Sequence, residues 1–258
     1  MASAQLPSEN AHAEYMAAPR RRTSIGSAIT FVLIVIAVIF VMSITFRVDN
    51  IIVNGNQHYT SQEIINAIEI EQGDNLFFFD RFAAITRVFA KLPYVTEVSI
   101  ERALPDKVII NVTESQAVAY LKLGNELWTM DEKCKILGKA AEGEEGTLIP
   151  ITGFNAGTLF INETITTADN DDRTVSYLKE VLYQIVERNL EYHITKIDFS
   201  NTNKVLLYYG GKYTINLGDP YATQHKFSIV LSAISKLQEG DIGIIDVSDG
   251  MNAKFSPY

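Results

Sequence analysis

Residues 24–46 read SIGSAITFVLIVIAVIFVMSITF, and this stretch decides how the rest of the chain is organised. It contains no charged residue, and its centre consists almost entirely of Ile, Val, Leu, Phe and Ala. An α-helix rises about 1.5 Å per residue and the hydrocarbon core of a bilayer is ~30 Å thick, so roughly 20 apolar residues span it. The stretch therefore predicts a single membrane-spanning helix.

Two other structures contain apolar runs near an N-terminus. A cleaved signal peptide has a shorter apolar region followed by a cleavage site of small residues, whereas this run leads into MSITFRVDN. A buried helix of a soluble protein usually keeps a polar face, and this stretch has none over about six turns. We therefore interpret it as a retained membrane anchor.

Positive charge predicts the orientation of the anchor. Three consecutive arginines precede the apolar stretch: Arg20, Arg21 and Arg22. Only Arg47 stands directly behind it. Because arginine-rich flanks stay in the cytoplasm, we expect residues 1–23 to be a disordered cytoplasmic tail and everything from Arg47 onward to lie outside the membrane.

The part of the chain beyond the anchor, about 210 residues, is acidic. Setting aside the three arginines and two glutamates of the first 46 residues leaves 19 basic and 29 acidic side chains, a net charge of −10. This balance argues against binding nucleic acid or an anionic membrane face. The single cysteine, Cys134, cannot form an intrachain disulfide, so folding must depend on packing.

The first segment after the anchor predicts the order strand, helix, helix, strand, strand. Asn54-Gly55-Asn56 ends the first strand, and residues 60–63 (TSQE) have the spacing at which Thr and Glu satisfy each other's backbone donors at a helix start. Asp80 is placed to cap a second helix, which stops at Pro93. Alternating apolar residues then mark two strands around the turn 103–106. We expect two helices on one face of a small sheet.

Several short motifs occur in this segment, directly after a lone membrane helix. They are Ile52-Val53-Asn54-Gly55-Asn56, Ser61 with Glu63-Ile64, Gly73, Asn75-Leu76-Phe77, Leu92-Pro93-Tyr94-Val95, Arg102, Pro105, Val112 and Glu114. Their order and intervals resemble the POTRA domain of the bacterial cell-division FtsQ/DivIB family. This chain departs from the family by having Ser115-Gln116-Ala117 in place of Arg-x-Pro and Lys107 in place of the more usual Thr.

The second half of the chain predicts a mixed α/β domain. The expected strands are 118–123, 126–130, 136–137, 148–151, 194–199, 204–209, 212–217 and 241–247, and the expected helices are 174–190 and 227–237. The family's C-terminal β-domain is similar in LIPITG, Ile197-Asp198-Phe199, Leu217-Gly218 with Lys226, and Ile245-Asp246-Val247. The resemblance therefore runs from Ser24 to the C-terminus.

The predicted fold class is α+β, in four parts. These are a cytoplasmic tail (1–23), a transmembrane helix (24–46), a POTRA domain of β-α-α-β-β order (47–116) and an FtsQ/DivIB-type β-domain with a largely antiparallel sheet (117–258).

Nothing in the residue inventory predicts catalysis. His12 lies in the tail, and His58, His193 and His225 are scattered without the spacing of a zinc site. Cys134 lies between two lysines, which can lower a thiol pKa, but no motif supplies a base beside it. We expect Cys134 to be a solvated turn cysteine, and we predict no enzyme activity, cofactor or metal.

The end of the chain is the expected partner-binding surface. A sheet edge carries unpaired N–H and C=O groups to which a partner strand can add, and residues 246–255 are placed to form one. From the residues alone, an inward-packed last strand followed by a frayed end is an equally good interpretation. The resemblance favours the edge, because in FtsQ/DivIB proteins the FtsB/DivIC partner pairs at the end of the β-domain. The expected contact residues are Asp246, Val247, Ser248, Met251, Lys254, Phe255 and Tyr258.

Residues 76–79 (LFFF) are a second apolar feature. Four consecutive apolar residues in an extended stretch cannot all face a core, so one of them can be exposed. The alternative, which we expect, is a loop that fills the space between two helices.

The resemblance implies a non-enzymatic scaffold that crosses the bacterial cell membrane once, at the division septum. It would hold partners of the FtsB/DivIC and FtsL type through the β-domain, and other division proteins through the POTRA domain, to help regulate septal peptidoglycan synthesis. Two alternatives are a POTRA-bearing component of another assembly or secretion system and a membrane-tethered cell-wall hydrolase. The first class ends in an outer-membrane barrel of many strands, and the second needs a nucleophile or a metal cluster.

Overall fold

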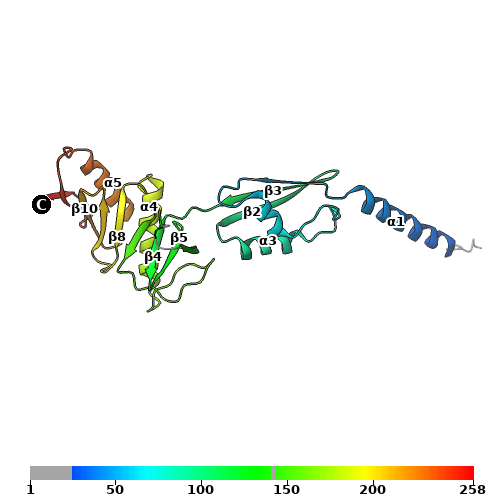
Figure 1. Ribbon diagram of the computed structural model, residues 1–258, viewed down its shortest axis with the longest axis horizontal. Coiled ribbons are helices and arrows are strands. Elements are labelled where there is room, and N and C mark those ends of the chain that lie inside the picture. The colour runs from blue at the N-terminus through cyan, green and yellow to red at the C-terminus, as the bar shows by residue number, and fades with distance from the viewer. Residues whose placement is uncertain (1–24, 141–142, 144) are drawn as a thin grey trace, which may run out of the picture. The chain divides into compact units, whose positions relative to one another are not determined.

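The computed structural model describes residues 25–140, 143 and 145–258 (Figure 1). The chain divides into two compact units, Met1–Phe46 and Arg47–Tyr258. The second unit contains two separate sheets, one of three strands and one of nine.

The described part of the first unit is one helix, α1 (Ile25–Thr45). Within the described residues it is the one helix whose length and composition suit a membrane span, over Gly26–Thr45. The predicted anchor is therefore present as a helix. Its first residue, Ser24, and the three arginines before it lie outside the described residues, as does the predicted tail.

The three-stranded sheet has the order β1-β3-β2, with β1 parallel and β2 antiparallel to β3. Its elements are β1 (Asn50–Asn54), α2 (Ser61–Ile68), α3 (Arg81–Lys91), β2 (Val95–Ala103) and β3 (Lys107–Glu114). Apolar residues of both helices and alternate residues of β3 form the buried interior between them. The predicted order of elements is confirmed.

Local capping explains where these helices begin. Thr60 and Glu63 form the predicted reciprocal cap of α2: the Glu63 N–H donates to Thr60 Oγ1 (3.3 Å) and the Thr60 N–H donates to Glu63 Oε2 (2.8 Å). Asp80 caps α3 by accepting the N–H groups of Phe82 and Ala83, both at 3.0 Å.

Side chains from beyond β3 satisfy carbonyl groups at the other end of α3. Asn162 Nδ2 donates to the Phe89 carbonyl (2.6 Å), and Lys135 Nζ donates to the Pro93 carbonyl (2.7 Å). Carbonyls in the last turn of a helix have no partner within the helix. These carbonyl groups therefore find their hydrogen-bond donors in residues that lie 42 and 73 positions further along the chain.

The nine-stranded sheet has the order β12-β11-β10-β9-β8-β7-β4-β5-β6. Its strands are β4 (Ala119–Leu123), β5 (Glu126–Met130), β6 (Ile136–Ala140), β7 (Ile149–Thr152), β8 (Ile194–Asp198), β9 (Val205–Tyr209), β10 (Tyr213–Gly218), β11 (Gly243–Asp246) and β12 (Lys254–Pro257). Five of its eight strand pairs are antiparallel, which confirms the predicted mixed, largely antiparallel sheet.

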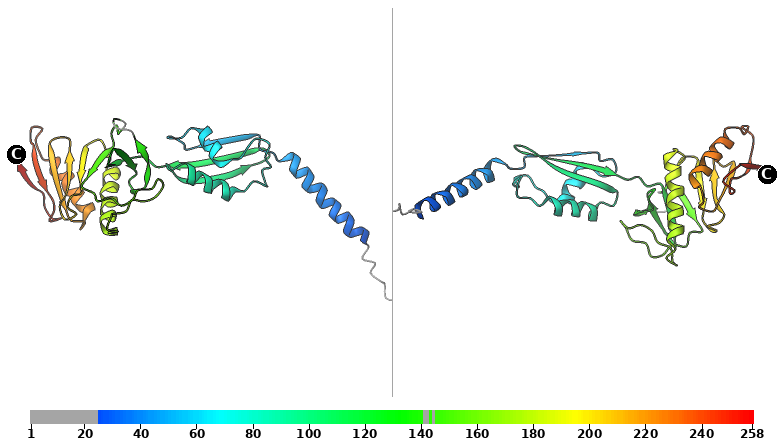
Figure 2. Two further views of the ribbon diagram at one scale, coloured as in Figure 1. Left: turned by 60° about the horizontal axis from the view of Figure 1, so that its bottom comes forward. Right: turned by 180° about the vertical axis from the view of Figure 1, so that it is seen from behind.

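Two helices, α4 (Asp172–Glu187) and α5 (Thr223–Ile234), lie side by side against this sheet (Figure 2). The buried stripe of α4 contains Leu178, Val181 and Leu182, and α5 contributes Phe227 and Val230 to the same core. Both helices were predicted from their apolar spacing, and in the structure each begins earlier than predicted.

The last strand, β12, was not predicted as a strand. The chain turns back after β11, and β12 pairs antiparallel with it in the register Gly243↔Pro257 to Asp246↔Lys254. A Cβ added to Gly243 would lie 2.3 Å from the Ser256 carbonyl oxygen and 2.8 Å from Pro257 Cα. The close approach of β12 therefore requires glycine at this position.

Substitution of Gly243 with alanine should displace β12. The added methyl group meets backbone, which cannot rotate away, and overpacking of this kind typically costs about 1–3 kcal/mol. We expect lower urea stability of residues 47–258 and faster amide exchange at Lys254 and Ser256, measured by hydrogen–deuterium exchange. Gly240→Ala is the matched control, because a Cβ there has nothing within 4 Å. Equal exchange in the two variants would contradict the role of Gly243.

A candidate partner-binding edge

The strand β12 is one edge of the nine-stranded sheet, and no other described strand pairs with its outer side. The Tyr258 N–H donates to the Ile242 carbonyl (3.2 Å), which fixes the phase of the ladder. Because antiparallel ladders alternate, Lys254 and Ser256 direct their backbone groups toward β11. The N–H and C=O of Phe255 and the C=O of Pro257 then face outward, whereas Pro257 has no N–H to offer.

The side chains of the terminal segment lie on both faces of the sheet. The Phe255 ring is half-buried and packs edge-to-face on Tyr213, with ring centroids 6.4 Å apart. Tyr258 is 73% exposed, and its hydroxyl is 2.7 Å from Thr214 Oγ1. Thr214 is paired with Ile244, another exposed residue. One ring therefore holds β12 on the core, and the other remains available on the surface.

The structure separates the seven predicted contact residues into two groups. Lys254, Phe255 and Tyr258 lie in β12 or next to it, and Met251 is exposed in the preceding loop. Three others are engaged within the chain: Asp246, Val247 and Ser248.

Asp246 is the last residue of β11, Val247 and Ser248 follow it, and the three do not form an exposed edge. Val247 is fully buried in the core, and its N–H donates to the Asn216 carbonyl (3.0 Å). Asp246 accepts hydrogen bonds from Asn216 Nδ2 (3.0 Å) and from the N–H and hydroxyl of Ser248. Burial opposes ionisation of Asp246, but these hydrogen bonds prevail and lower its pKa. We predicted a sheet edge over residues 246–255. In the structure the edge is β12, residues 254–257, because β12 pairs with β11 and covers it.

A buried charge supports the loop that leads into β12. Lys226, in the first turn of α5, is fully buried, and its Nζ donates to the Asp219 carboxylate and carbonyl, both at 2.9 Å. That hydrogen bond lowers the pKa of the Asp219 carboxyl. A Cβ added to Gly218 would lie 2.6 Å from Ser248 Cβ, and one added to Gly250 would lie 3.7 Å from Lys226 Cε. The turn before α5 and the loop after β11 therefore pack on one another.

The two sheets have three further edge strands among the described residues: β6 in the nine-stranded sheet, and β1 and β2 in the three-stranded sheet. At the far end of the nine-stranded sheet, β6 is partly covered, because the Ile136 N–H donates to the Glu163 carbonyl (2.8 Å) and the Asn162 N–H donates to the Ile136 carbonyl (2.7 Å).

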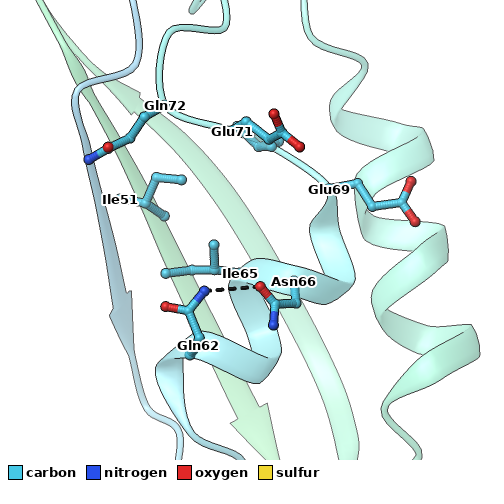
Figure 3. A pocket seen from close by; sticks show the side chains of 8 residues that line it. Ile51, Gln62, Ile65, Asn66, Glu69, Glu71 and Gln72 are labelled. Carbon is cyan, nitrogen blue, oxygen red and sulfur yellow. Dashed lines mark hydrogen bonds between the residues drawn. The ribbon is translucent and has the colours of Figure 1, made fainter.

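In the three-stranded sheet, β1 borders an open groove of about 540 Å³, into which Ile51 and Ile65 point (Figure 3). Gln62 in this groove donates to Asn66, and Glu69 pairs with basic residues of α3. The groove is an open surface whose lining contains no Lys, Arg, His, Ser, Thr or Cys residue.

Two of the described histidines each stack on a tyrosine ring. His58 stacks on Tyr94 with ring centroids 3.6 Å apart, and His193 stacks on Tyr209 at 5.3 Å. Among the described residues, no group of three or more His, Cys, Asp or Glu side chains is placed to hold a metal ion. Cys134 is buried, in contrast to our prediction of a solvated turn cysteine: it ends the turn after Asp131, but its side chain points into the core.

Comparison with known proteins agrees with this architecture. A family model described as POTRA domain, FtsQ-type, matches residues 46–115. The cell division protein DivIB of Clostridium botulinum (strain Hall) is 24% identical over 247 residues, which cover 94% of this chain and 95% of that protein. Residues 46–115 therefore match an FtsQ-type POTRA domain, and the chain is similar to DivIB proteins over nearly its whole length.

Other relatives match over different lengths. DivIB of Bacillus subtilis is 23% identical over 227 residues, 87% of this chain and 80% of that protein. FtsQ of Streptomyces coelicolor is 30% identical over 117 residues, 45% of this chain and 44% of that protein. With one N-terminal apolar helix of membrane-spanning length among its described residues, the chain fits a single-pass membrane protein.

Ser115 is one of the positions at which this chain departs from the family pattern, and its side chain has a structural role. Ser115 Oγ donates to Asp131 Oδ2 (2.8 Å), and Asp131 also accepts the N–H groups of Lys133 and Lys135, both at 2.9 Å. The serine therefore ties the end of β3 to the turn that contains Cys134. The other departure, Lys107, is exposed at the start of β3.

Burial should make Cys134 unreactive in the folded protein. Desolvation disfavours the thiolate and raises the pKa of Cys134 well above its ordinary value. We expect maleimide to label the chain only after urea is added, with intact-mass spectrometry as the measurement. Rapid labelling of the native chain at neutral pH would show that the thiol is accessible.

Removal of Asp219 should destabilise the fold more than removal of Lys226. Asp219→Ala leaves an uncompensated buried ammonium, for which the expected loss is about 3 kcal/mol, whereas Lys226→Met leaves a carboxylate that solvent can reach. Urea unfolding of residues 47–258 measures both. Because the folded-state pKa of Asp219 is depressed, its contribution is present at neutral pH and declines as the pH falls through that lowered value. A smaller loss for Asp219→Ala than for Lys226→Met would contradict this account.

Proposed function

We propose that this chain is a non-enzymatic scaffold of the bacterial division machinery that docks a partner strand along β12. The partner class is that of FtsB/DivIC with FtsL, and the bound complex helps regulate septal peptidoglycan synthesis. The observation that carries the proposal is the open outer side of β12, a strand whose inner side is fixed to the core. Strand addition needs such an edge.

The chemistry of the edge suits an extended peptide. Phe255 offers one outward N–H and one outward C=O, and Pro257 offers a further C=O. Lys254 and Asp249 form an ion pair at 3.6 Å beside the strand, so the rim of the site is charged. A partner strand with polar rim residues and an apolar side chain directed toward Ile244 or Tyr258 fits this surface.

The membrane topology is part of the same proposal. The tail with Arg20, Arg21 and Arg22 lies in the cytoplasm, and residues 47–258 lie outside the membrane at the septum. This arrangement presents β12 to partners whose own folded parts are outside the membrane. The relatives are named cell division proteins, which supports a location at the septum.

Two variants at one position test backbone pairing at β12. Phe255→Ala removes the ring and keeps the outward N–H, whereas Phe255→Pro removes both. The inward bonds of Lys254 and Ser256 remain in both variants, because proline at an edge removes only an outward donor. Loss of one interstrand bond leaves a partner carbonyl unpaired, so we expect Phe255→Pro to bind about tenfold more weakly than Phe255→Ala.

The measurement is the Kd of the full chain in nanodiscs for a purified DivIC/FtsB-type ectodomain in complex with its FtsL partner. Near-ultraviolet circular dichroism checks that both variants remain folded. Equal affinities for Phe255→Ala and Phe255→Pro would exclude strand addition at β12 and leave docking through side chains.

A further inference from the structure

Three exposed apolar side chains mark the end of the three-stranded sheet at which β1 begins. Phe78 is 66% exposed, Phe82 is 74% exposed and Leu104 is 61% exposed. Phe78 and Phe82 flank the start of α3, and Leu104 lies in the turn between β2 and β3. Phe77 is also exposed, whereas Leu76 is fully buried, so our expectation that residues 76–79 only fill space between helices is wrong for half of the stretch.

Hydrogen bonds hold both loops on the first residues after the anchor. Arg47 forms a bridge with Asn75, and the Val48 N–H donates to the Asp74 carbonyl (2.8 Å). The Asp49 N–H donates to the Asp106 carbonyl (2.8 Å) in the β2–β3 turn. The cation of Arg102 lies 4.9 Å from the centroid of the Phe79 ring, which joins the two loops from the other side.

The chain itself limits how far these loops can lie from a bilayer. The apolar stretch ends at Phe46, and three residues of extended chain reach at most roughly 11 Å. Asp49 and the loops bonded to it are therefore confined to the headgroup zone or directly above it when the anchor spans the membrane. Aromatic and leucine side chains at this depth insert into the boundary between headgroups and acyl chains.

We propose that Phe78, Phe82 and Leu104 form a membrane-contact surface that inserts into the outer face of the lipid bilayer. This inference rests on the proposed function only for the orientation of the anchor. It concerns lipid and is independent of the docking of a partner at β12.

The charges around the surface indicate whether contact depends on the charge of the lipid. Arg81 stacks over Phe82 at 5.5 Å and Arg102 over Phe79, while Asp80 is occupied as the cap of α3 and Asp74 accepts the Glu71 N–H. Positive and negative side chains are both present, so the surface is not a basic patch. Contact therefore depends on apolar insertion and should occur with zwitterionic phosphatidylcholine at any moderate salt concentration.

A tryptophan reporter at position 78 tests the inference in the full chain. Trp128 is the only native tryptophan and is nearly buried, so the unmodified chain supplies a constant background. The Phe78→Trp variant is reconstituted in phosphatidylcholine nanodiscs that each hold one copy of the chain. The acyl chains of the lipid are either unmodified or brominated, and bromine quenches tryptophan fluorescence on contact. The control is Tyr221→Trp, at a residue that is 75% exposed in the turn before α5 of the other sheet.

We expect bromine to quench the added emission of Phe78→Trp at least about twofold and to leave that of Tyr221→Trp unchanged. Absence of quenching at position 78 would overturn the inference. Protection of the residue only after partner proteins are added would also overturn it, since the surface would then bind protein. Binding of the DivIC/FtsB-type partner in the same nanodiscs tests the proposed function separately, so either can fail without the other.

Discussion

Backbone pairing at the end of the nine-stranded sheet is the constraint on which the rest of this structure depends. A strand that pairs with the edge of a sheet becomes the new edge, and the N–H and C=O groups on its outer side are then unpaired. β11 is closed by β12, and this closure needs the bare backbone of Gly243 and the loop that Lys226 supports. The last strand is therefore both a structural element and the open edge to which another strand can add.

The buried Lys226 shows why this end of the sheet is well defined. A cation in the first turn of a helix opposes the helix dipole, and burying an ammonium is costly without a partner. The pair with Asp219 offsets both effects, and the second bond, to the Asp219 carbonyl, fixes the turn between β10 and α5. Ser248 packs beside Gly218, directly before this turn. The Lys226–Asp219 contact therefore also helps to position the loop that leads from β11 into β12.

Most of the fold could be predicted because it is encoded in local patterns. The anchor, α2 with its Thr60–Glu63 cap, and α4 follow from hydrophobic spacing and capping residues. β12 could not be predicted, because Lys254–Pro257 contains one large apolar residue and a proline, and its pairing depends on Gly243 more than ten positions earlier. The burial of Cys134 was also missed, since its two lysine neighbours indicate solvent and only the tertiary fold shows which way the thiol points. In the candidate site, the seven expected contact residues remain a prediction, and the sequence did not show which of them are buried and which are exposed.

The short edge also limits how a partner can bind. Three outward backbone groups give at most three interstrand hydrogen bonds, each contributing a net ~1 kcal/mol, whereas micromolar affinity requires about 8 kcal/mol. Backbone pairing alone therefore cannot account for a stable complex. The remainder must come from side chains that lose water on binding, and the exposed candidates around β12 are Tyr258, Ile244 and Met251. In the proposed complex, the edge determines the register and direction of the partner strand, and the apolar side chains beside it determine affinity.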